Sequence, residues 1–128
     1  MKRADCGYPY KELSGCGVGF KLVQAYIHKH HIPEEQAYTL LPLLAMSIAS
    51  DIVPVTGENR VLAYYGLRQL NKRPPVGVYA IMQVAGIADK TINISDLVYK
   101  IGPRINACGR IQSGTEAVRL LITDGLAF

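Results

Sequence analysis

The fold of this chain depends on one stretch near its middle, SDIVPVTGENR (residues 50–60). This stretch places a single acid, Asp51, in the middle of an apolar run. Pro54 has no backbone N–H to donate and cannot continue a helix, so residues 51–57 are predicted to form a turn or loop. Helical patterns lie on both sides of this segment, and the loop is therefore expected to join two helices.

The segments before and after this loop have the periodicity of amphipathic helices. Before it, Pro33 fits the first position of a helix that ends near Ile48, and Pro42 is expected to kink that helix because it removes one internal hydrogen bond. After it, Thr56 is expected to cap a helix that reaches about Asn71.

Four further helices are expected from capping residues and stop signals, and no stretch alternates as a β-strand does. Ser14 begins the first of them, which runs to about residue 31. The others are a short helix ended by Gly86, a helix capped by Ser95 and interrupted at Gly102-Pro103, and a last helix begun by a capping box over residues 113–116. The predicted fold class is mainly α, with about six helices and short connections.

Composition and charge limit the class of protein. The 128 residues suffice for one compact domain, and 49% of them are hydrophobic, which excludes a disordered tail. The net charge of +4 mildly favours a polyanionic partner such as nucleic acid. Three irregularly spaced cysteines fit free thiols in a reducing cytosol. The chain lacks a signal-peptide pattern at its start, and its longest apolar run, residues 40–49, is too short to span a bilayer. These features predict a soluble, cytoplasmic protein without a membrane partner.

Asp51 is the first candidate for chemistry, and two interpretations of it are open. A carboxylate within an apolar run must be hydrogen-bonded, paired or bound to a cation. It is either a metal ligand or a cap or turn acid that faces solvent. Since Mg²⁺ and Mn²⁺ take about six ligands, and Glu58 is the only other acid nearby, Asp51 alone cannot build such a site.

A second stretch, PRINACGR (residues 103–110), concentrates residue types that bind phosphate. The candidates are Arg104, Asn106, Gly109 and Arg110. Arginine makes bidentate contacts to phosphate, asparagine can cap or orient, and glycine lets the backbone approach a ligand closely. The stretch is expected to be loop-like. The alternative to phosphate binding is a turn between helices with solvated arginines.

Other clusters favour structural roles. His28, His30 and His31 come at a predicted helix end, where imidazolium suits the dipole, and His30 and His31 project in different directions on a helix. The tyrosines are expected to pack at the edge of the core rather than to stack on bases. Because the chain has no nucleophile elbow, P-loop, HExxH or dinucleotide fingerprint, composition and spacing alone predict only a soluble, basic helical domain.

Three stretches, in order, resemble motifs of the RecJ-type single-stranded-DNA-specific exonucleases, which belong to the DHH phosphoesterase superfamily. Residues 8–21, YPYKELSGCGVGFK, are similar to the segment that follows the Asp-His-His motif of that family. Residues 50–60 resemble its fourth motif, in which Ser50 stands where alanine is common, and residues 103–110 resemble its PRxNAxGR motif. The matches extend over nearly the whole chain.

The resemblance implies a metal-dependent nuclease of DNA repair and recombination that degrades single-stranded DNA from its 5′ end. By this resemblance, Asp51 corresponds to a ligand in a two-metal Mn²⁺ or Mg²⁺ centre, which activates water and stabilises charge on the attacked phosphate. Arg104, Asn106, Gly109 and Arg110 lie in the motif that faces the DNA path between two lobes, where they would hold phosphates of the strand.

Several motifs of the family are missing, including the Asp-His-His triplet and the C-terminal glycine-rich motif of the DHHA1 lobe. The chain is therefore expected to be an internal fragment of a two-lobe α/β protein, inactive alone, whose partners are single-stranded DNA and the rest of the parent chain. Residues 1–57 would end the catalytic lobe, residues 58–102 would connect, and residues 103–128 would begin the second lobe. Two alternatives stay open: a non-catalytic helical module that binds nucleic acid or protein, and another DHH phosphoesterase acting on short oligonucleotides. No oligomeric state follows from these motifs.

Overall fold

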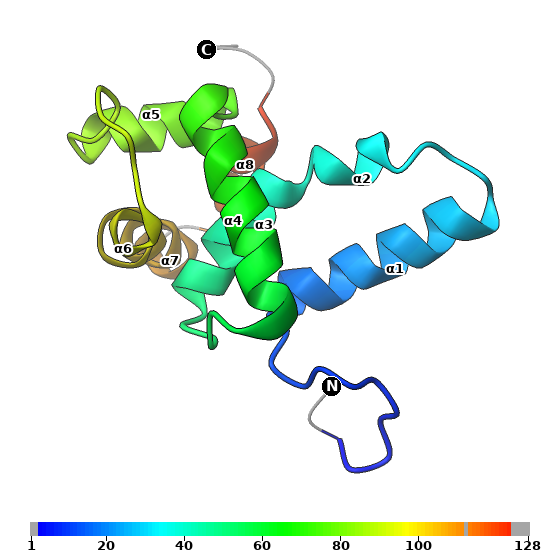
Figure 1. Ribbon diagram of the computed structural model, residues 1–128. Coiled ribbons are helices and arrows are strands. Elements are labelled where there is room, and N and C mark those ends of the chain that lie inside the picture. Colours follow the sequence, from blue (N-terminus) through cyan, green and yellow to red (C-terminus); the bar gives the residue numbers. More distant parts are fainter. Residues whose placement is uncertain (1–2, 112, 124–128) are drawn as a thin grey trace.

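The computed structural model describes residues 3–111 and 113–123, and every regular element in that part of the chain is helical (Figure 1). The elements are α1 (Gly15–Lys29), α2 (Glu35–Tyr38), α3 (Leu41–Ser50), α4 (Gly57–Lys72), α5 (Val76–Val84), α6 (Ile94–Asp96), the π-helical turn η1 (Leu97–Ile101), α7 (Gly102–Ile111) and α8 (Gly114–Ile122). Since α6, η1 and α7 are continuous, the described residues form seven separate helical rods. The mainly α prediction is confirmed.

Helix α3 is the centre of the fold, because both apolar cores include its residues. One core combines Ala45, Met46 and Ala49 of α3 with side chains of α5, η1 and the loop before α6. The other combines Leu44 and Ile48 with side chains of α1 and α4. A helix that is apolar on nearly all sides must be surrounded by partners. The loop after residue 50 is therefore anchored to the most buried helix in the described structure.

Helix α4 crosses α3 at very short range, and Gly66 makes the crossing possible (Figure 1). A Cβ atom at Gly66 would lie 2.1 Å from the carbonyl oxygen of Leu41 and 2.8 Å from Cβ of Ala45. Backbone cannot move aside as a flexible side chain can, so only glycine fits here. The helices on either side of residues 51–56 are thus held as one unit.

The helix predicted to begin at Pro33 and to kink at Pro42 is two helices. Pro33 precedes α2 instead of starting it, and Thr39 and Leu40 form a turn that separates α2 from α3. Pro42 lies in the first turn of α3. Its missing N–H costs nothing there, since the first N–H groups of a helix have no partner within the helix. The prediction of a kink was wrong because Pro42 begins a helix.

The interruption predicted at Gly102-Pro103 was also wrong, and so was the cap at Ser95. Asn93 is the cap: its side chain accepts a hydrogen bond from the Asp96 N–H, and the Asp96 side chain accepts one from the Asn93 N–H. The wider π-helical turn of η1 then accommodates Pro103 within the helix, because the Gly102 N–H bonds to the Leu97 carbonyl five residues back. Helix continues through Pro103 as a result.

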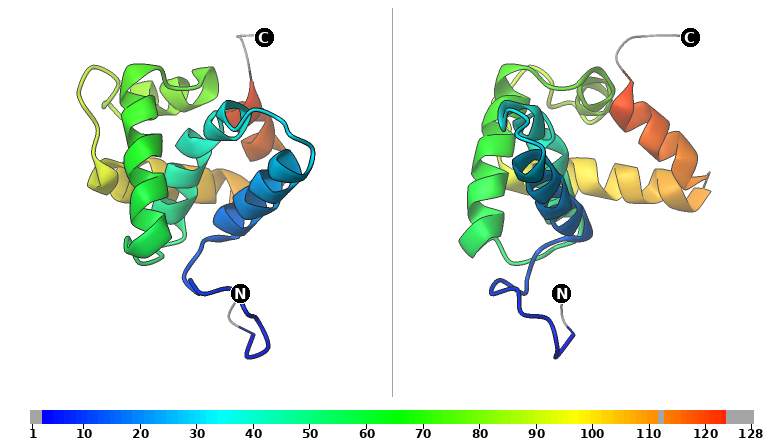
Figure 2. Two further views of the ribbon diagram at one scale, coloured as in Figure 1. Left: turned by 45° about the vertical axis from the view of Figure 1, so that its right-hand side comes forward. Right: turned by 90° about the vertical axis from the view of Figure 1, so that its right-hand side faces the viewer.

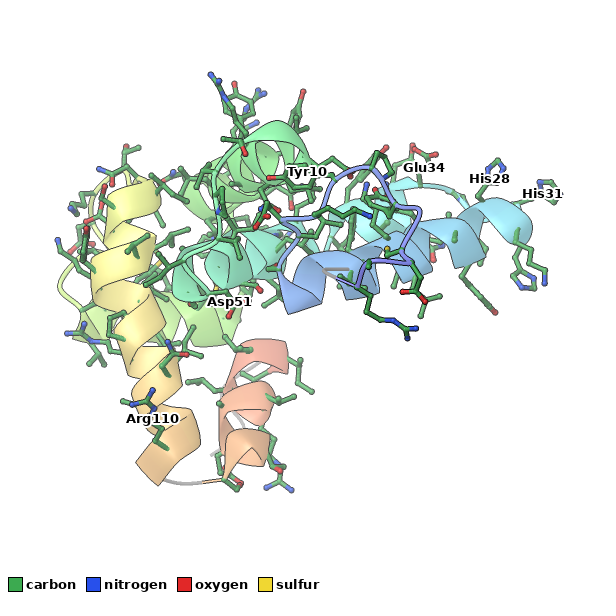
Figure 3. All side chains as sticks on the ribbon, turned by 90° about the horizontal axis from the view of Figure 1, so that it is seen from below. Tyr10, His28, His31, Glu34, Asp51 and Arg110 are labelled. Atoms are coloured by element: carbon green, nitrogen blue, oxygen red, sulfur yellow. The ribbon has the colours of Figure 1, made fainter. Side chains whose placement is uncertain are left out.

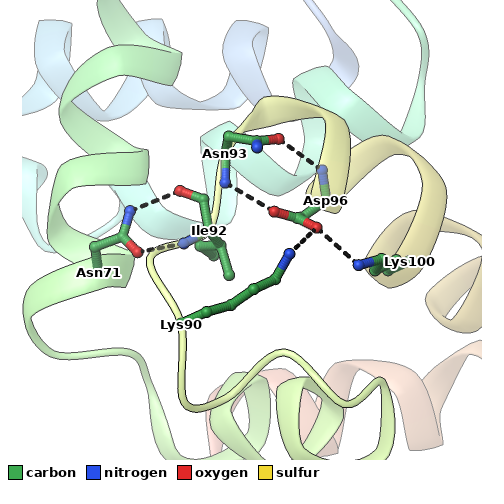
Figure 4. A network of polar contacts seen from close by, with 6 residues as sticks. All are labelled: Asn71, Lys90, Ile92, Asn93, Asp96 and Lys100. Carbon is green, nitrogen blue, oxygen red and sulfur yellow. Dashed lines mark hydrogen bonds and ion pairs between the residues drawn. The ribbon is translucent and has the colours of Figure 1, made fainter.

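A polar network fixes the start of this rod to α4 (Figure 4). Asn71 accepts a hydrogen bond from the Ile92 N–H and donates one to the Ile92 carbonyl, at 2.8 Å and 2.9 Å. Beside it, Lys90 and Lys100 contact the buried Asp96 carboxylate at 2.8 Å and 3.0 Å. The Lys90 hydrogen bond, with those from the Asn93 backbone and Lys100, holds the pKa of Asp96 well below its usual value.

Two other predicted caps have the right position without the predicted bond. Thr56 and Ser113 are the N-cap residues of α4 and α8, but neither side chain bonds to the helix. Glu116 pairs with Arg119 at 2.9 Å instead of closing a capping box. Figure 2 shows α8 running back from the end of α7 toward α5. None of the described helices combines the length and the apolar character that crossing a membrane requires.

Candidate functional site

Asp51 is the C-terminal cap of α3, and its side chain is exposed. Its N–H bonds to the Ser47 carbonyl at 2.9 Å, so the backbone completes the last helical turn. A carboxylate is unfavourable at this end of a helix, where the partial charge of the dipole is also negative.

Two serine hydroxyls connect the Asp51 carboxylate to the start of α1. Ser47 Oγ lies 3.1 Å from Asp51 Oδ2 and 3.0 Å from Ser14 Oγ. Ser14 is buried and caps α1 by accepting the Gly17 N–H at 3.1 Å. The first turn of α1 is close enough that burial and the Asp51 charge together raise the pKa of the Cys16 thiol.

The residue after Asp51 has an unfavourable backbone. Ile52 has φ of +52°, and its side chain is 80% exposed. A β-branched residue rarely adopts this left-handed conformation, because Cβ meets the neighbouring carbonyl. Further along the loop, Tyr10 donates its hydroxyl to the Thr56 carbonyl at 2.7 Å, and its ring covers Gly57, which has φ of +48°. The loop is thus held at both of its ends.

Asn59 of the TGENR segment connects the loop to the chain before α1. Asn59 is fully buried and donates to the carbonyls of Glu12 and Pro54, at 2.7 Å and 2.9 Å. Its amide oxygen has no hydrogen-bond partner in the described part of the chain. Sequence reasoning placed Tyr10 at the edge of the core but missed its hydrogen bond, and it missed Asn59 and Ser47, because polar residues next to a loop are usually solvated. Their contacts to carbonyls and hydroxyls distant in sequence have no sequence signal.

Glu58, the acid nearest to Asp51 in the sequence, interacts with Tyr8 and with Lys21 of α1. Its carboxylate accepts the Tyr8 hydroxyl at 2.6 Å and contacts the Lys21 ammonium at 2.5 Å. Partial burial acts to raise the pKa of Glu58, but the hydrogen bonds from Lys21 and Tyr8 outweigh it, so that pKa is lowered. Among the described residues, no three His, Cys, Asp or Glu side chains are placed to share a metal ion. Asp51 would need ligands from elsewhere.

The stretch at residues 103–110 is helical, so the expected loop was wrong. Arg104, Asn106, Gly109 and Arg110 are all exposed on α7. Arg104 donates to the Lys100 carbonyl at 2.6 Å. Asn106 and Arg110 make no hydrogen bond or ion pair with any described residue, which leaves both side chains free to meet a ligand.

The four candidates of α7 do not share one face. At about 100° per residue, Asn106 and Arg110 are one turn apart on the same side, and Gly109 flanks them. Arg104 projects about 120° away from Arg110. It lines a cavity of about 350 Å³ between α5, α7 and α8 together with Ile105 and Cys108.

The face with Asn106 and Gly109 begins beside Asp51. Gly102 precedes Asn106 by one turn, and a Cβ atom at Gly102 would lie 3.0 Å from Ser50 Oγ and 3.3 Å from Ser50 Cα. The residue before Asp51 is therefore in contact with the start of α7. Figure 3 shows Asp51 at the end of α3 and Arg110 toward the far end of α7. The structure thus places the first motif against the start of α7, the helix that contains the second motif.

Other hollows and clusters lie apart from this site. A cleft of about 860 Å³ between α1, α2 and α4 includes Lys21, Tyr38 and Tyr65 in its lining but not Asp51. His28 and His31 extend from the far end of α1 (Figure 3). They are exposed and distant from the loop after α3.

Comparisons with known proteins agree in sequence and in fold. The chain is 36% identical over 123 residues to the single-stranded-DNA-specific exonuclease RecJ of Bacillus subtilis, a match that covers 96% of the chain and 15% of that protein. It is 32% identical to the RecJ of Escherichia coli, covering 95% of the chain and 23% of that protein. No protein-family model matches the chain.

Solved structures give the same result. The crystal structure of Thermus thermophilus RecJ with Mn²⁺ superposes with a TM-score of 0.78 at 30% identity, covering 91% of this chain and 17% of that one. The Mg²⁺ complex gives a TM-score of 0.79 and covers 94% of this chain and 19% of that one. The chain thus spans less than a quarter of the length of the curated relatives it matches.

Proposed function

We infer, from a match in sequence and fold to one internal part of the RecJ exonucleases, that this chain is a segment of a metal-dependent 5′-to-3′ single-stranded-DNA exonuclease. The observation that carries the proposal is the contact between the first motif and the start of the helix that contains the second, because Gly102 packs against the residue preceding Asp51. A carboxylate beside a helix face with Asn and Arg suits hydrolysis of a phosphodiester. In the parent protein we expect single-stranded DNA as the partner and the cytoplasm as the location.

We propose that the segment contributes to two lobes. Residues 1–57 would complete the catalytic lobe, residues 58–102 would connect, and residues 103–128 would begin the second lobe. The second boundary falls within the continuous rod of α6, η1 and α7. A rigid rod across this boundary would keep the phosphate-binding face at a constant distance from Asp51.

Asp51 is the proposed ligand of Mn²⁺ or Mg²⁺. The similar solved structures are of RecJ in complex with Mn²⁺ or Mg²⁺. An exposed carboxylate with one hydrogen-bonded oxygen fits a hard cation, since its other lone pairs are available. The remaining ligands would come from the rest of the parent chain. The bound metal would lower the pKa of a water molecule and offset charge on the phosphate.

Asn106 and Arg110 are the proposed phosphate contacts, and Gly109 leaves the backbone between them open. Both side chains are exposed and uncommitted on the face that begins beside Asp51. Arg104 lies on another face of α7 and is bonded to the Lys100 carbonyl, so it would make at most a peripheral contact with the phosphates. These contacts would position a strand without regard to its sequence.

The test of this function uses the full-length parent protein. Asp51→Asn should reduce Mn²⁺-dependent release of nucleotides from single-stranded DNA by orders of magnitude, because an amide cannot offset the charge of the cation. Asp89→Asn is the matched control, since Asp89 is an exposed turn residue without a hydrogen bond or ion pair to a described residue. Near-normal turnover of Asp51→Asn would remove Asp51 from the metal site.

The purified 128-residue chain separates the nuclease from its alternatives. One carboxylate cannot assemble a two-metal centre, so we expect no hydrolysis of single-stranded DNA by this chain with Mn²⁺. Metal-dependent release of nucleotides that Asp51→Ala abolishes would contradict that expectation. A parent gene without an upstream Asp-His-His motif would favour the non-catalytic helical module instead.

A further inference from the structure

We propose that Ser47 is a positioning residue that holds the Asp51 carboxylate in the orientation required by a divalent cation, and that Ser14 directs the Ser47 hydroxyl. The inference rests on the proposed function of Asp51 and extends it to the end of another helix. Its basis is the row of polar atoms from the Gly17 N–H through Ser14 Oγ and Ser47 Oγ to Asp51 Oδ2, with successive separations of 3.1, 3.0 and 3.1 Å.

Counting hydrogens gives this row a direction. Ser47 has one hydroxyl hydrogen and two acceptor neighbours within hydrogen-bond distance, so it can donate to only one of them. An ionised Asp51 carboxylate can only accept, and a hydrogen bond to a charged acceptor is the stronger one. Ser47 therefore donates to Asp51, and Ser14 donates its own hydrogen to Ser47.

The Gly17 N–H completes the row because it donates a hydrogen bond to Ser14 Oγ. Ser14 Oγ accepts from this backbone donor, which α1 holds in place, so the Ser14 hydrogen is free to point at Ser47. Each oxygen then accepts one hydrogen bond and donates one, and such a row strengthens cooperatively. Ser14 is 2% exposed, so water does not compete for its hydroxyl.

Asp51 needs this support because nothing else in the described structure orients it. Its side chain is exposed at the unfavourable end of a helix dipole, and Ser47 is the only described side chain that hydrogen-bonds to it. Ser47 occupies the position one turn earlier on α3, from which a hydroxyl reaches one carboxylate oxygen and leaves the other free. A free carboxylate would lose rotamer entropy on binding a cation, and this hydrogen bond reduces that loss.

The experiment measures binding of Mn²⁺ alone to the full-length parent protein by titration calorimetry. Ser47→Ala should weaken Mn²⁺ binding by about 10- to 100-fold, the usual effect of removing a group that orients a metal ligand. Ser47→Thr keeps a hydroxyl and should restore most of the affinity. Ser14→Ala should produce a smaller loss in the same direction. At saturating DNA, kcat should fall for Ser47→Ala while KM for DNA stays constant.

Ser95→Ala is the matched control, since Ser95 is an exposed serine of α6 whose side chain makes no hydrogen bond or ion pair with a described residue. Its Mn²⁺ affinity should equal that of the unmodified protein. Unchanged affinity in Ser47→Ala, together with a loss in Asp51→Asn, would overturn this inference and leave the proposed function standing. Unchanged affinity in Asp51→Asn would overturn both. A loss in Ser47→Ala that Ser47→Thr does not repair, with a lower melting temperature of the metal-free protein, would assign Ser47 to packing and overturn the positioning role.

Discussion

The two motif-bearing regions of this protein are built in opposite ways. In the hairpin of α3, its loop and α4, contacts in and around the motif hold the fold together: Asn59 is buried, Tyr10 covers Gly57, and Ser47 contacts Asp51. In α7, the motif is an exposed helical surface on which Asn106 and Arg110 contact no described polar partner. The two motifs thus differ in the extent to which their residues stabilise the fold.

This difference separates structural from chemical residues in the two motifs. In the first motif, one exposed carboxylate performs the proposed chemistry and its neighbours fix its position. In the second, the proposed chemistry is spread over several side chains, and the fold uses the packing of Ile105 and the contact at Gly102 just before the motif. The same substitution should therefore destabilise the first region and leave the second stable.

Replacing glycine by alanine should give the largest difference in unfolding free energy between the two regions. Gly66→Ala in the 128-residue chain should lower the free energy of unfolding by at least about 3 kcal/mol, because the new methyl group meets the backbone of α3. Gly109→Ala, where a Cβ atom meets nothing within 4 Å, should raise it by up to about 1 kcal/mol through helix propensity. Urea unfolding followed by circular dichroism measures both. Equal effects would contradict the contrast.

Replacing asparagine by alanine should give the next largest difference in unfolding free energy between the two regions. Asn59→Ala removes a buried amide that donates to two backbone carbonyls, and should cost about 2 kcal/mol of unfolding free energy. Asn106→Ala removes an exposed side chain without a described partner, and should change stability by less than about 0.5 kcal/mol. Thermal denaturation of the two variants side by side is the measurement. A loss at Asn106 as large as that at Asn59 would show that α7 is also packed by its motif.

The arginines test whether α7 is a binding surface. In the parent protein, Arg110→Ala should weaken binding to single strands of any sequence and flatten the log–log dependence on salt by about 0.7 for the lost phosphate contact. The melting temperature should stay constant. Arg104→Ala should flatten the slope less, because Arg104 projects from another face.

Arg68→Ala, which removes an exposed charge from α4, is the control for that measurement. Fluorescence anisotropy at several salt concentrations gives the slopes. If Arg110→Ala leaves the slope unchanged and lowers the melting temperature, the residue serves the architecture and not the DNA.

A small gain in stability is expected from a substitution at Ile52. Ile52→Gly should raise the unfolding free energy by up to about 1 kcal/mol, since glycine relieves the left-handed strain but gains entropy when unfolded. The side chain is 80% exposed, so little packing is lost. Chemical denaturation measures the gain. A loss of stability instead would show that the isoleucine side chain packs more than its exposure indicates.

Sequence reasoning predicted the helical class, the loop after Ser50 and the capping role of Ser14, because these follow from local periodicity and capping chemistry. It did not predict the uninterrupted helix at Pro103, since a π-helical turn is stabilised by packing and has no marker in the sequence. It placed a cap at Ser95 because serine and asparagine are both good caps, and only the pairing of Asn93 with Asp96 decides between them.

For the candidate site, the sequence identified the exposed groups and missed the groups that hold them. Asp51 and Arg110 stand out because their charge types suit a metal and a phosphate. Ser47 and Asn59 do not, because the atoms they contact are brought close only by the folded chain. The different orientations of Arg104 and Arg110 likewise follow from helical geometry, which could not be applied to a stretch expected to be a loop.

The continuous rod from Ile94 to Ile111 acts as a lever. It is roughly 27 Å long at 1.5 Å per residue, and Ile92, two residues before its first residue, is clamped to α4 by two hydrogen bonds with Asn71. A tilt of only a few degrees at the clamp would therefore displace Arg110 by roughly 2 Å at the other end. The position of the proposed phosphate-binding face therefore depends on how the start of the rod is held. Substitutions at Lys90 or Asn71 should alter how a bound strand lies in the parent protein without contacting it.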